Sequence, residues 1–358
     1  MSSIKNVFPG GNTFRGFHSF YDYIIPNDEA NRIFCIKGGP GVGKSSFMKS
    51  IAAHFVEMGY DVEHHHCSSD SNSLDGVVIK QAKVAILDGT TPHIMDPKTP
   101  GAVDEILNFG AFWDEDGLKQ ERKAILKLNK ELKGLFNSAY HYLRCAKELQ
   151  DDIETTVEET VVQAEYGQLV LDLKMELFDG LASSGKAGRD RHLFHNALTP
   201  DGRIDYIDTI ISDGCKCCLL EGANQKGASE ILYMLANEYL LKGYNVEIYH
   251  QPLNPERLET ILVEKLNLAL TIDSKVKNKS VKTLNLDEAI ISEKLLAKDD
   301  WIKKDKELME TLLNEAFRRI KAAKLSHDKL EKYYIPQMDF VEVTRLKKQV
   351  IEKIMSYL

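Results

Sequence analysis

The sequence has few cysteines and no long apolar run. Six cysteines in 358 residues are too few for the dense disulfide framework of small secreted proteins. No segment approaches the roughly 20 consecutive apolar residues that span a bilayer, and the first residues, MSSIKNVFPGG, lack the apolar core of a secretory signal. We therefore expect a cytoplasmic protein in a reducing environment, without membrane association.

An excess of positive charge is also missing. The chain has 46 Lys and Arg against 54 Asp and Glu, a formal net charge of −8. This balance makes nucleic acid or an acidic membrane surface an unfavourable partner. The length allows about two or three domains.

Glycine is concentrated in one stretch, GGPGVGKSS, residues 38–46. Gly38, Gly43, Lys44 and Ser45 fill the pattern G-x-x-x-x-G-K-[ST], which is typical of a P-loop. An apolar run at 33–36 precedes it and a segment with helical periodicity follows, so strand, loop and helix come in the order that phosphate binding requires. The residues predicted to bind a nucleotide are Gly38, Gly39, Pro40, Gly41, Val42, Gly43, Lys44, Ser45 and Ser46.

The residue types in this stretch predict specific roles. Glycines let backbone N–H groups turn toward a polyphosphate, Lys44 would contact the β- and γ-phosphates, and the Ser45 hydroxyl would bind Mg²⁺. Asp88 closes the apolar run 84–87 and is predicted to be the second acid on the Mg²⁺ side. Lys44 and Asp88 are thus the predicted catalytic residues, Ser45 and Asp88 the metal-binding residues, and ATP and Mg²⁺ the cofactors. No N-K-x-D follows, which favours ATP over GTP, and no LSGGQ-type signature indicates a transporter ATPase.

The chain repeats itself. At a shift of 184, Gly38, Gly43 and Ser45 align with Gly222, Gly227 and Ser229, and at a shift of 177 the helical segments align. We predict an α/β fold of two tandem P-loop NTPase-like repeats, residues 1–186 and 187–358. Each repeat is expected to have a parallel sheet, with a polar loop and a short helix between its second and third strands. Each should end in an α-helical hairpin arm, at about 115–182 and 294–358.

The second repeat is predicted to be degenerate. Its loop reads GANQKGAS, so Ala228 replaces Lys44 and Gln225 replaces Gly41. Lys226 lies two positions before Ala228, the counterpart of Lys44. Asp88 aligns with Ile272, although a small gap would bring Asp273 into its place. Without the lysine the γ-phosphate loses its main protein cation, so we expect one competent site and one degenerate site.

Several other residues are weaker candidates for a role in this site. His93 and Asp96 follow the Asp88 strand and could orient water or a second substrate, or simply belong to a capped turn. His66, at the end of a strand, is expected near the nucleotide pocket, and Asp70 is a candidate water-positioning acid. The run His64–Cys67 is not favoured as a metal site, because neighbours on a strand face opposite sides. The candidate charge-neutralising arginines are Arg15, Arg189, Arg191 and Arg203.

The whole chain resembles a family of bacterial tandem P-loop ATPases that have no established biological role. The resemblance rests on FYDYII before IKGGPGVGKSSFMKSIA, on HCSSDSNSLDGVVI, on LDGTTPHIMDPKTPGAVDEILNFGAFWDE, and on RHLFHNALTPDGRIDYID in the second half. It implies a tandem P-loop NTPase fold with ATP bound at Gly38 to Ser46, and it supplies no substrate.

The function expected from these features is Mg²⁺-dependent ATP hydrolysis at one site, with helical arms that pass the nucleotide state to a protein partner or support self-association. Two alternatives stay open. A small-molecule or nucleotide kinase would hold its phosphate acceptor with residues 88–93 and the polar loop after His66. A non-hydrolysing, nucleotide-gated scaffold would bind ATP without turnover.

Overall fold

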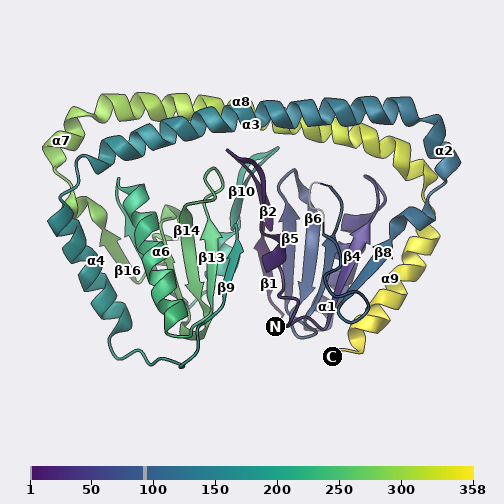
Figure 1. The fold of residues 1–358 in the computed structure, drawn as a ribbon, viewed down its shortest axis with the longest axis horizontal. Helices are drawn as coiled ribbons and strands as arrows, with labels where there is room; N and C mark the ends of the chain where they lie inside the picture. The colour runs from purple at the N-terminus through teal and green to yellow at the C-terminus, as the bar shows by residue number, and fades with distance from the viewer. Residues whose placement is uncertain (1, 92–94) are drawn as a thin grey trace.

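The first sheet is built from residues of the first repeat (Figure 1). The computed structural model describes residues 2–91 and 95–358. In spatial order the strands are β1 (Ile4–Val7), β5 (Val62–Cys67), β6 (Asp70–Ile79), β7 (Val84–Asp88), β4 (Arg32–Lys37) and β8 (Asp104–Asn108). Strand β6 is antiparallel to both of its neighbours, and the other pairs are parallel.

The second sheet repeats this order. Its strands are β9 (Asp190–Leu193), β13 (Val246–His250), β14 (Leu258–Val263), β15 (Leu268–Thr271), β12 (Lys216–Glu221) and β16 (Lys282–Asn285). The register is also repeated: Arg32 pairs with Val84, and Lys216, 184 positions after Arg32, pairs with Leu268. The two-repeat arrangement predicted from the sequence fits this structure.

The expectation of wholly parallel sheets is wrong, and so is that of a polar loop and short helix after the second strand. Residues 70–79 form β6, which turns back directly on β5. The β-branched residues Val77, Val78 and Ile79 favour a strand, and all three are buried. Because a tight turn joins antiparallel strands, the short connection after Cys67 imposes a mixed sheet.

Shorter elements complete each repeat. Helices α1 (Lys44–Glu57) and α6 (Gln225–Leu241) pack on the two sheets through their apolar residues. Two hairpins, β2 (Gly10–Thr13) with β3 (Gly16–Ser19) and β10 (Asn196–Thr199) with β11 (Gly202–Asp205), lie between the sheets. The short helices are η1 (Tyr21–Tyr23), η2 (Phe109–Phe112), α5 (Ile207–Ile210), η3 (Glu264–Leu266), η4 (Ser274–Val276), η5 (Leu286–Ala289) and η6 (Ile335–Gln337).

The predicted helical hairpins do not form. After α2 (Glu115–Gln120), helix α3 (Arg122–Glu158) crosses from the first sheet to the second, and α4 (Gln163–Phe178) packs on the second sheet. In the second repeat, α7 (Ser292–Ala297) leads into α8 (Asp299–Tyr334), which crosses back, and α9 (Phe340–Met355) packs on the first sheet. The two arms are therefore exchanged between the repeats.

The long helices lie side by side in opposite directions (Figure 1), and small residues explain their close packing. Ala139 and Ala146 of α3 and Ala316 and Ala323 of α8 are fully buried. At 37 residues, α3 spans about 55 Å, long enough to cross both sheets. Its apolar seam is thus filled by α8 rather than by α4.

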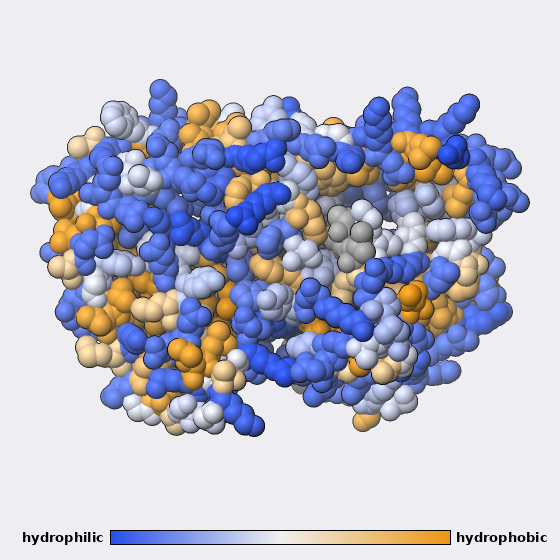
Figure 2. Space-filling view, in the orientation of Figure 1, coloured by the Kyte–Doolittle hydropathy of each residue, from blue (hydrophilic) through white to orange (hydrophobic). Residues whose placement is uncertain are grey.

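Within the described residues, no helix is both long and apolar enough to cross a membrane. On the face shown in Figure 2, hydrophilic side chains predominate over the arms, and apolar groups lie in separate clusters. Self-association or partner binding through the arms stays a prediction.

Candidate functional site

The glycine-rich loop, residues 38–43, joins the last residue of β4 to the first turn of α1. Gly41 and Gly43 have φ values of +67° and +89°, in the left-handed region that favours glycine. Gly43 is the N-cap of α1, so no side chain caps this helix. The positive end of the helix dipole is therefore left to face whatever the loop encloses.

Lys44 and Asp88, the two predicted catalytic residues, come together at this loop. Lys44 Nζ donates to the carbonyl of Gly39 at 2.7 Å and lies 3.5 Å from Asp88 Oδ2. Asp88 Oδ1 accepts from Thr90 N–H at 3.0 Å and from the Thr90 hydroxyl at 2.6 Å. The parallel pairing of β7 with β4 places Asp88 beside Ile36, which explains how residues 44 positions apart meet.

Ser45 is tied to β6. Its Oγ accepts a hydrogen bond from Leu74 N–H at 2.9 Å, which leaves its proton and a second lone pair for another partner. Ser229 makes the same contact with Leu258 N–H at 2.8 Å in the second repeat. This contact is thus a feature of the repeat and does not by itself indicate a ligand.

The other predicted loop residues differ in exposure. Val42 is fully buried in the core, Ser46 is exposed, and Pro40 is half-buried. Gly38 and Gly39 line an open cavity of about 450 Å³ together with Lys37, Asn108, Gly110 and Trp113. A ligand held by the loop could extend into this space.

The exchanged arm of the second repeat covers the loop. A Cβ placed on Gly39 would lie 2.6 Å from the Tyr334 ring, and one on Gly43 would lie 3.3 Å from the Phe340 ring. On Gly41 it would lie 3.0 Å from Cβ of Glu331. The backbone conformation therefore favours glycine at positions 41 and 43, and all three glycines allow the close approach of α8 and α9.

The second repeat has no such loop. Helix α6 begins at Gln225, the counterpart of Gly41, so residues that form the loop in the first repeat are helical here. Asn224 Oδ1 caps the helix by accepting from Gly227 N–H at 2.9 Å, and Ala223 N–H donates to Asp287 Oδ1 at 2.7 Å. Lys226 is ion-paired with Glu158 at 2.7 Å. The backbone N–H groups of Ala223 and Gly227 at this helix N-terminus thus already have partners within the protein.

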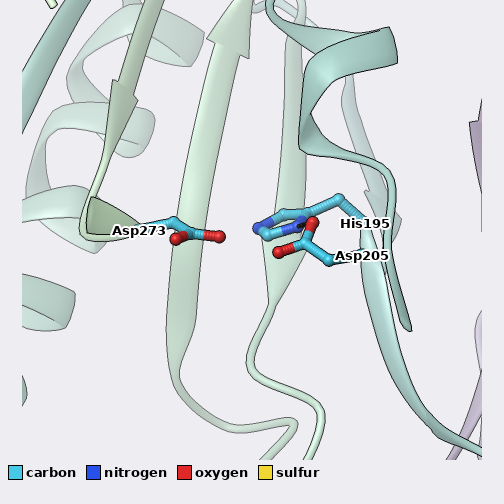
Figure 3. A group of neighbouring side chains, drawn as sticks. All are labelled: His195, Asp205 and Asp273. Atoms are coloured by element: carbon cyan, nitrogen blue, oxygen red, sulfur yellow. Dashed lines mark hydrogen bonds and ion pairs between the residues drawn. The ribbon is translucent and has the colours of Figure 1, made fainter. Parts of the chain in front are cut away.

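Asp273 does not replace Asp88 in the second repeat. Thr271, the counterpart of Leu87, keeps the register of Leu87 within the sheet, and Ile272 directly after it packs against the core under α6. Asp273 lies instead beside His195 and Asp205 (Figure 3). The gap proposed in the alignment does not exist, because the strand pairing is unshifted.

His195, Asp205 and Asp273 form a group that the sequence did not suggest, because they come from three separate segments. Their potential ligand atoms lie within 4.8 Å of one another, so the group could hold a divalent cation. His195 Nδ1 lies 3.0 Å from Asp205 Oδ1, and Lys275 Nζ lies 2.7 Å from Asp205 Oδ2. Lys275 already supplies positive charge here, so the geometry is also that of an ion-pair network.

Other residues predicted to lie near the nucleotide site include His66, Asp96 and His93. His66 lies away from the loop: its Nε2 is 2.9 Å from Asn6 Oδ1, and its ring lies 4.6 Å from that of Tyr206 in the second repeat. The expectation that it borders a nucleotide pocket is wrong, because β6 and β7 separate β5 from β4. Asp96 lies 2.9 Å from Lys37 Nζ, and His93 lies outside the described residues.

The four candidate arginines are engaged elsewhere. Among the described residues, no hydrogen bond or ion pair joins any of them to the loop. Their acidic partners are Glu256 for Arg15, Asp28 and Glu29 for Arg189, Glu63 and Glu247 for Arg191, and Glu259 for Arg203. Three of these arginines link the two repeats, so their positions reflect the interface.

Comparisons of the chain with protein-family models, with curated proteins and with solved structures gave no significant match. The resemblance to tandem P-loop ATPases stays a prediction.

Proposed function

We propose that the protein binds ATP with Mg²⁺ at residues 38–46 and hydrolyses it at this one site. The observation that carries the proposal is the loop itself: two glycines at positive φ lead into an uncapped helix, with Lys44 and Asp88 in contact at its start. Backbone amides, a helix dipole and a lysine are the groups that bind polyphosphates.

Lys44 would change partners when a nucleotide binds. Its ammonium now lies on the Gly39 carbonyl, within the loop, and a phosphate oxygen is a stronger acceptor because it is charged. Only 12% of the Lys44 side chain is exposed, so the charge is poorly screened and its effect on a bound phosphate is large. Lys44 would thereby favour the triphosphate over nucleotides with fewer phosphates.

Ser45 and Asp88 would hold Mg²⁺. The Ser45 hydroxyl has a free lone pair, and Asp88 presents Oδ2 toward Lys44 and the loop, so these oxygen ligands suit the ion. When bound, Mg²⁺ neutralises charge on the β- and γ-phosphates.

A small-molecule kinase is the second candidate, and the cavity beside Gly38 and Gly39 favours it. Lys37 and Asn108 give this cavity polar groups that an acceptor could contact. The cavity would equally suit the nucleoside part of ATP.

Phosphate release measured with and without a mixture of small metabolites separates the two candidates. The ATPase proposal predicts release of phosphate from ATP alone, dependent on Mg²⁺. Nucleotide consumption only in the presence of metabolites, without free phosphate, would favour the kinase.

A further inference from the structure

One face of α8 brings ionisable side chains to the glycine-rich loop. Lys324 and His327, like Asp328 and Glu331, are three residues apart, and each of the first pair has a partner four residues on in the second, so the four share a face of the helix. Lys324 Nζ lies 3.4 Å from Asp70 Oδ2 and also pairs with Asp328, which fixes this face over the start of β6.

Glu331 is the member of this face that meets the loop. A Cβ on Gly41 would lie 3.0 Å from Glu331 Cβ and 3.1 Å from its Cα, so the helix backbone itself rests on the loop at this residue. About a third of the Glu331 side chain is exposed, 32%, so the packing of α8 on the loop does not bury it.

The equivalent residue of the first arm shows what is different here. Glu154, 177 positions earlier on α3, is buried, accepts from Gln150 Nε2 at 3.1 Å and pairs with Arg257 at 3.2 Å. At a shift of 184, Arg257 corresponds to Ser73, so the first repeat has no arginine at this place. Over the second repeat, where the loop is missing, the carboxylate of Glu154 is thus paired with an arginine. Over the loop of the first repeat, Glu331 has no arginine at the corresponding position.

Glu331 lies beside His327, whose Nδ1 is 3.6 Å from Glu331 Oε1. Burial lowers the pKa of His327 below its ordinary value; Glu331 offsets part of this effect, and Lys324 adds to it. The contact with His327 therefore does not give Glu331 the permanent positive partner that Arg257 gives Glu154.

We propose that Glu331, supplied by the second repeat, is the general base of the nucleotide site in the first repeat. This inference rests on the proposed ATP hydrolysis. The water oxygen forms a bond to the γ-phosphorus, and the bond from that phosphorus to the β,γ-bridging oxygen breaks. One water proton passes to the Glu331 carboxylate, and ADP and phosphate leave.

This role explains why the arms are exchanged. Helix α8 begins beside the second sheet and reaches the loop only at its last turns, so the site is complete only when both repeats are packed together. The first sheet alone would bind nucleotide without the base.

The test compares Glu331→Gln with Glu154→Gln, the matched change on the other arm. Two quantities are measured for each: the Kd of a non-hydrolysable ATP analogue with Mg²⁺, and phosphate release in a single turnover. For Glu331→Gln we expect analogue binding equal to or tighter than that of the wild type, because a negative charge near the phosphates is lost. We expect phosphate release to fall by about 10²–10⁴-fold. Glu154→Gln should leave both unchanged.

A third variant, Glu331→Asp, keeps the charge and should recover part of the activity that Glu331→Gln loses. Phosphate release by Glu331→Gln within threefold of the wild-type rate would overturn the role of Glu331. If the wild type still bound the analogue and hydrolysed ATP, the proposed function would stand. Failure of the wild type to bind the analogue at all would overturn both.

Discussion

The guanidinium of Arg191, in the second repeat, donates from Nη2 to Glu63 Oε2 in the first repeat at 2.6 Å, and from Nη1 to Glu247 at 2.9 Å. Lys5, the counterpart of Arg191, pairs with Glu247, the counterpart of Glu63. Equivalent ion pairs thus link the two repeats twice, each between a basic residue of one repeat and a glutamate of the other. Burial alone would raise the pKa of Glu63, but Arg191 and His65 more than offset it and hold that pKa well below its usual range.

Replacing Arg191 with methionine should lower the free energy of unfolding by about 3–5 kcal/mol, because Glu63, with 3% of its side chain exposed, would stay buried without its closest charged partner. Urea denaturation at pH 7 measures this loss. Arg189→Met is the control: Arg189 pairs with Asp28 at the surface, so its loss should cost less than about 1 kcal/mol. Equal losses in the two variants would contradict the account of the interface.

Gly41→Ala should weaken binding of an ATP analogue by at least about tenfold. The new Cβ meets Glu331 at 3.0 Å, and φ of +67° strains a residue with a side chain by about 1–2 kcal/mol. Isothermal titration of the analogue measures the effect.

Gly59→Ala provides the control for that strain. Gly59 also has positive φ, +92°, but nothing lies within 4 Å of its Cβ position. This variant should lose similar stability and keep its affinity. A loss of affinity in Gly59→Ala would show that strain, rather than contact at the loop, governs binding.

The protein should lose stability as the pH falls from about 6.5 to 4. Burial, with smaller contributions from nearby positive charges, lowers the pKa values of His64 and His66 to about 4, against 6.5 in the unfolded chain. Between these values the unfolded state binds more protons, so acid favours unfolding, by about 1–2 kcal/mol for each partly exposed ring.

Urea denaturation at pH 7 and pH 5 checks this dependence. His66→Gln should show a smaller loss between the two pH values than the wild type. His141→Gln, which alters an exposed histidine on α3, should show the wild-type loss. An unchanged pH dependence in His66→Gln would count against burial as its cause.

The sequence correctly predicted the parts of the fold that depend on residues close together in the chain. The loop from Gly38, the start of α1 and the meeting of Lys44 with Asp88 follow from adjacent strand and helix patterns. The repeat also related the predicted strands that became β4, β5 and β7 to β12, β13 and β15 of the second sheet. The polar run after Cys67 misled the expectation for β6, because its serines and aspartate mark a tight turn as readily as a loop.

The exchange of the arms could not be predicted in the same way. The seam of α3 shows that an apolar partner is needed, but α4 and α8 both offer apolar faces, and periodicity does not choose between them. Glu331 lies 290 positions after Gly41, and its counterpart Glu154 looks the same in the sequence. Only the packing of α8 on the loop separates the two.

Binding of a nucleoside triphosphate by residues 38–46 through Lys44 is tested most directly by titration of a non-hydrolysable ATP analogue with Mg²⁺. Lys226, at the head of the equivalent helix in the second repeat, gives the control. We predict that wild type and Lys226→Ala bind the analogue alike, and that Lys44→Ala loses about a hundredfold in affinity, as expected for a hydrogen bond between charged groups. Equal affinity in all three proteins would contradict the claim.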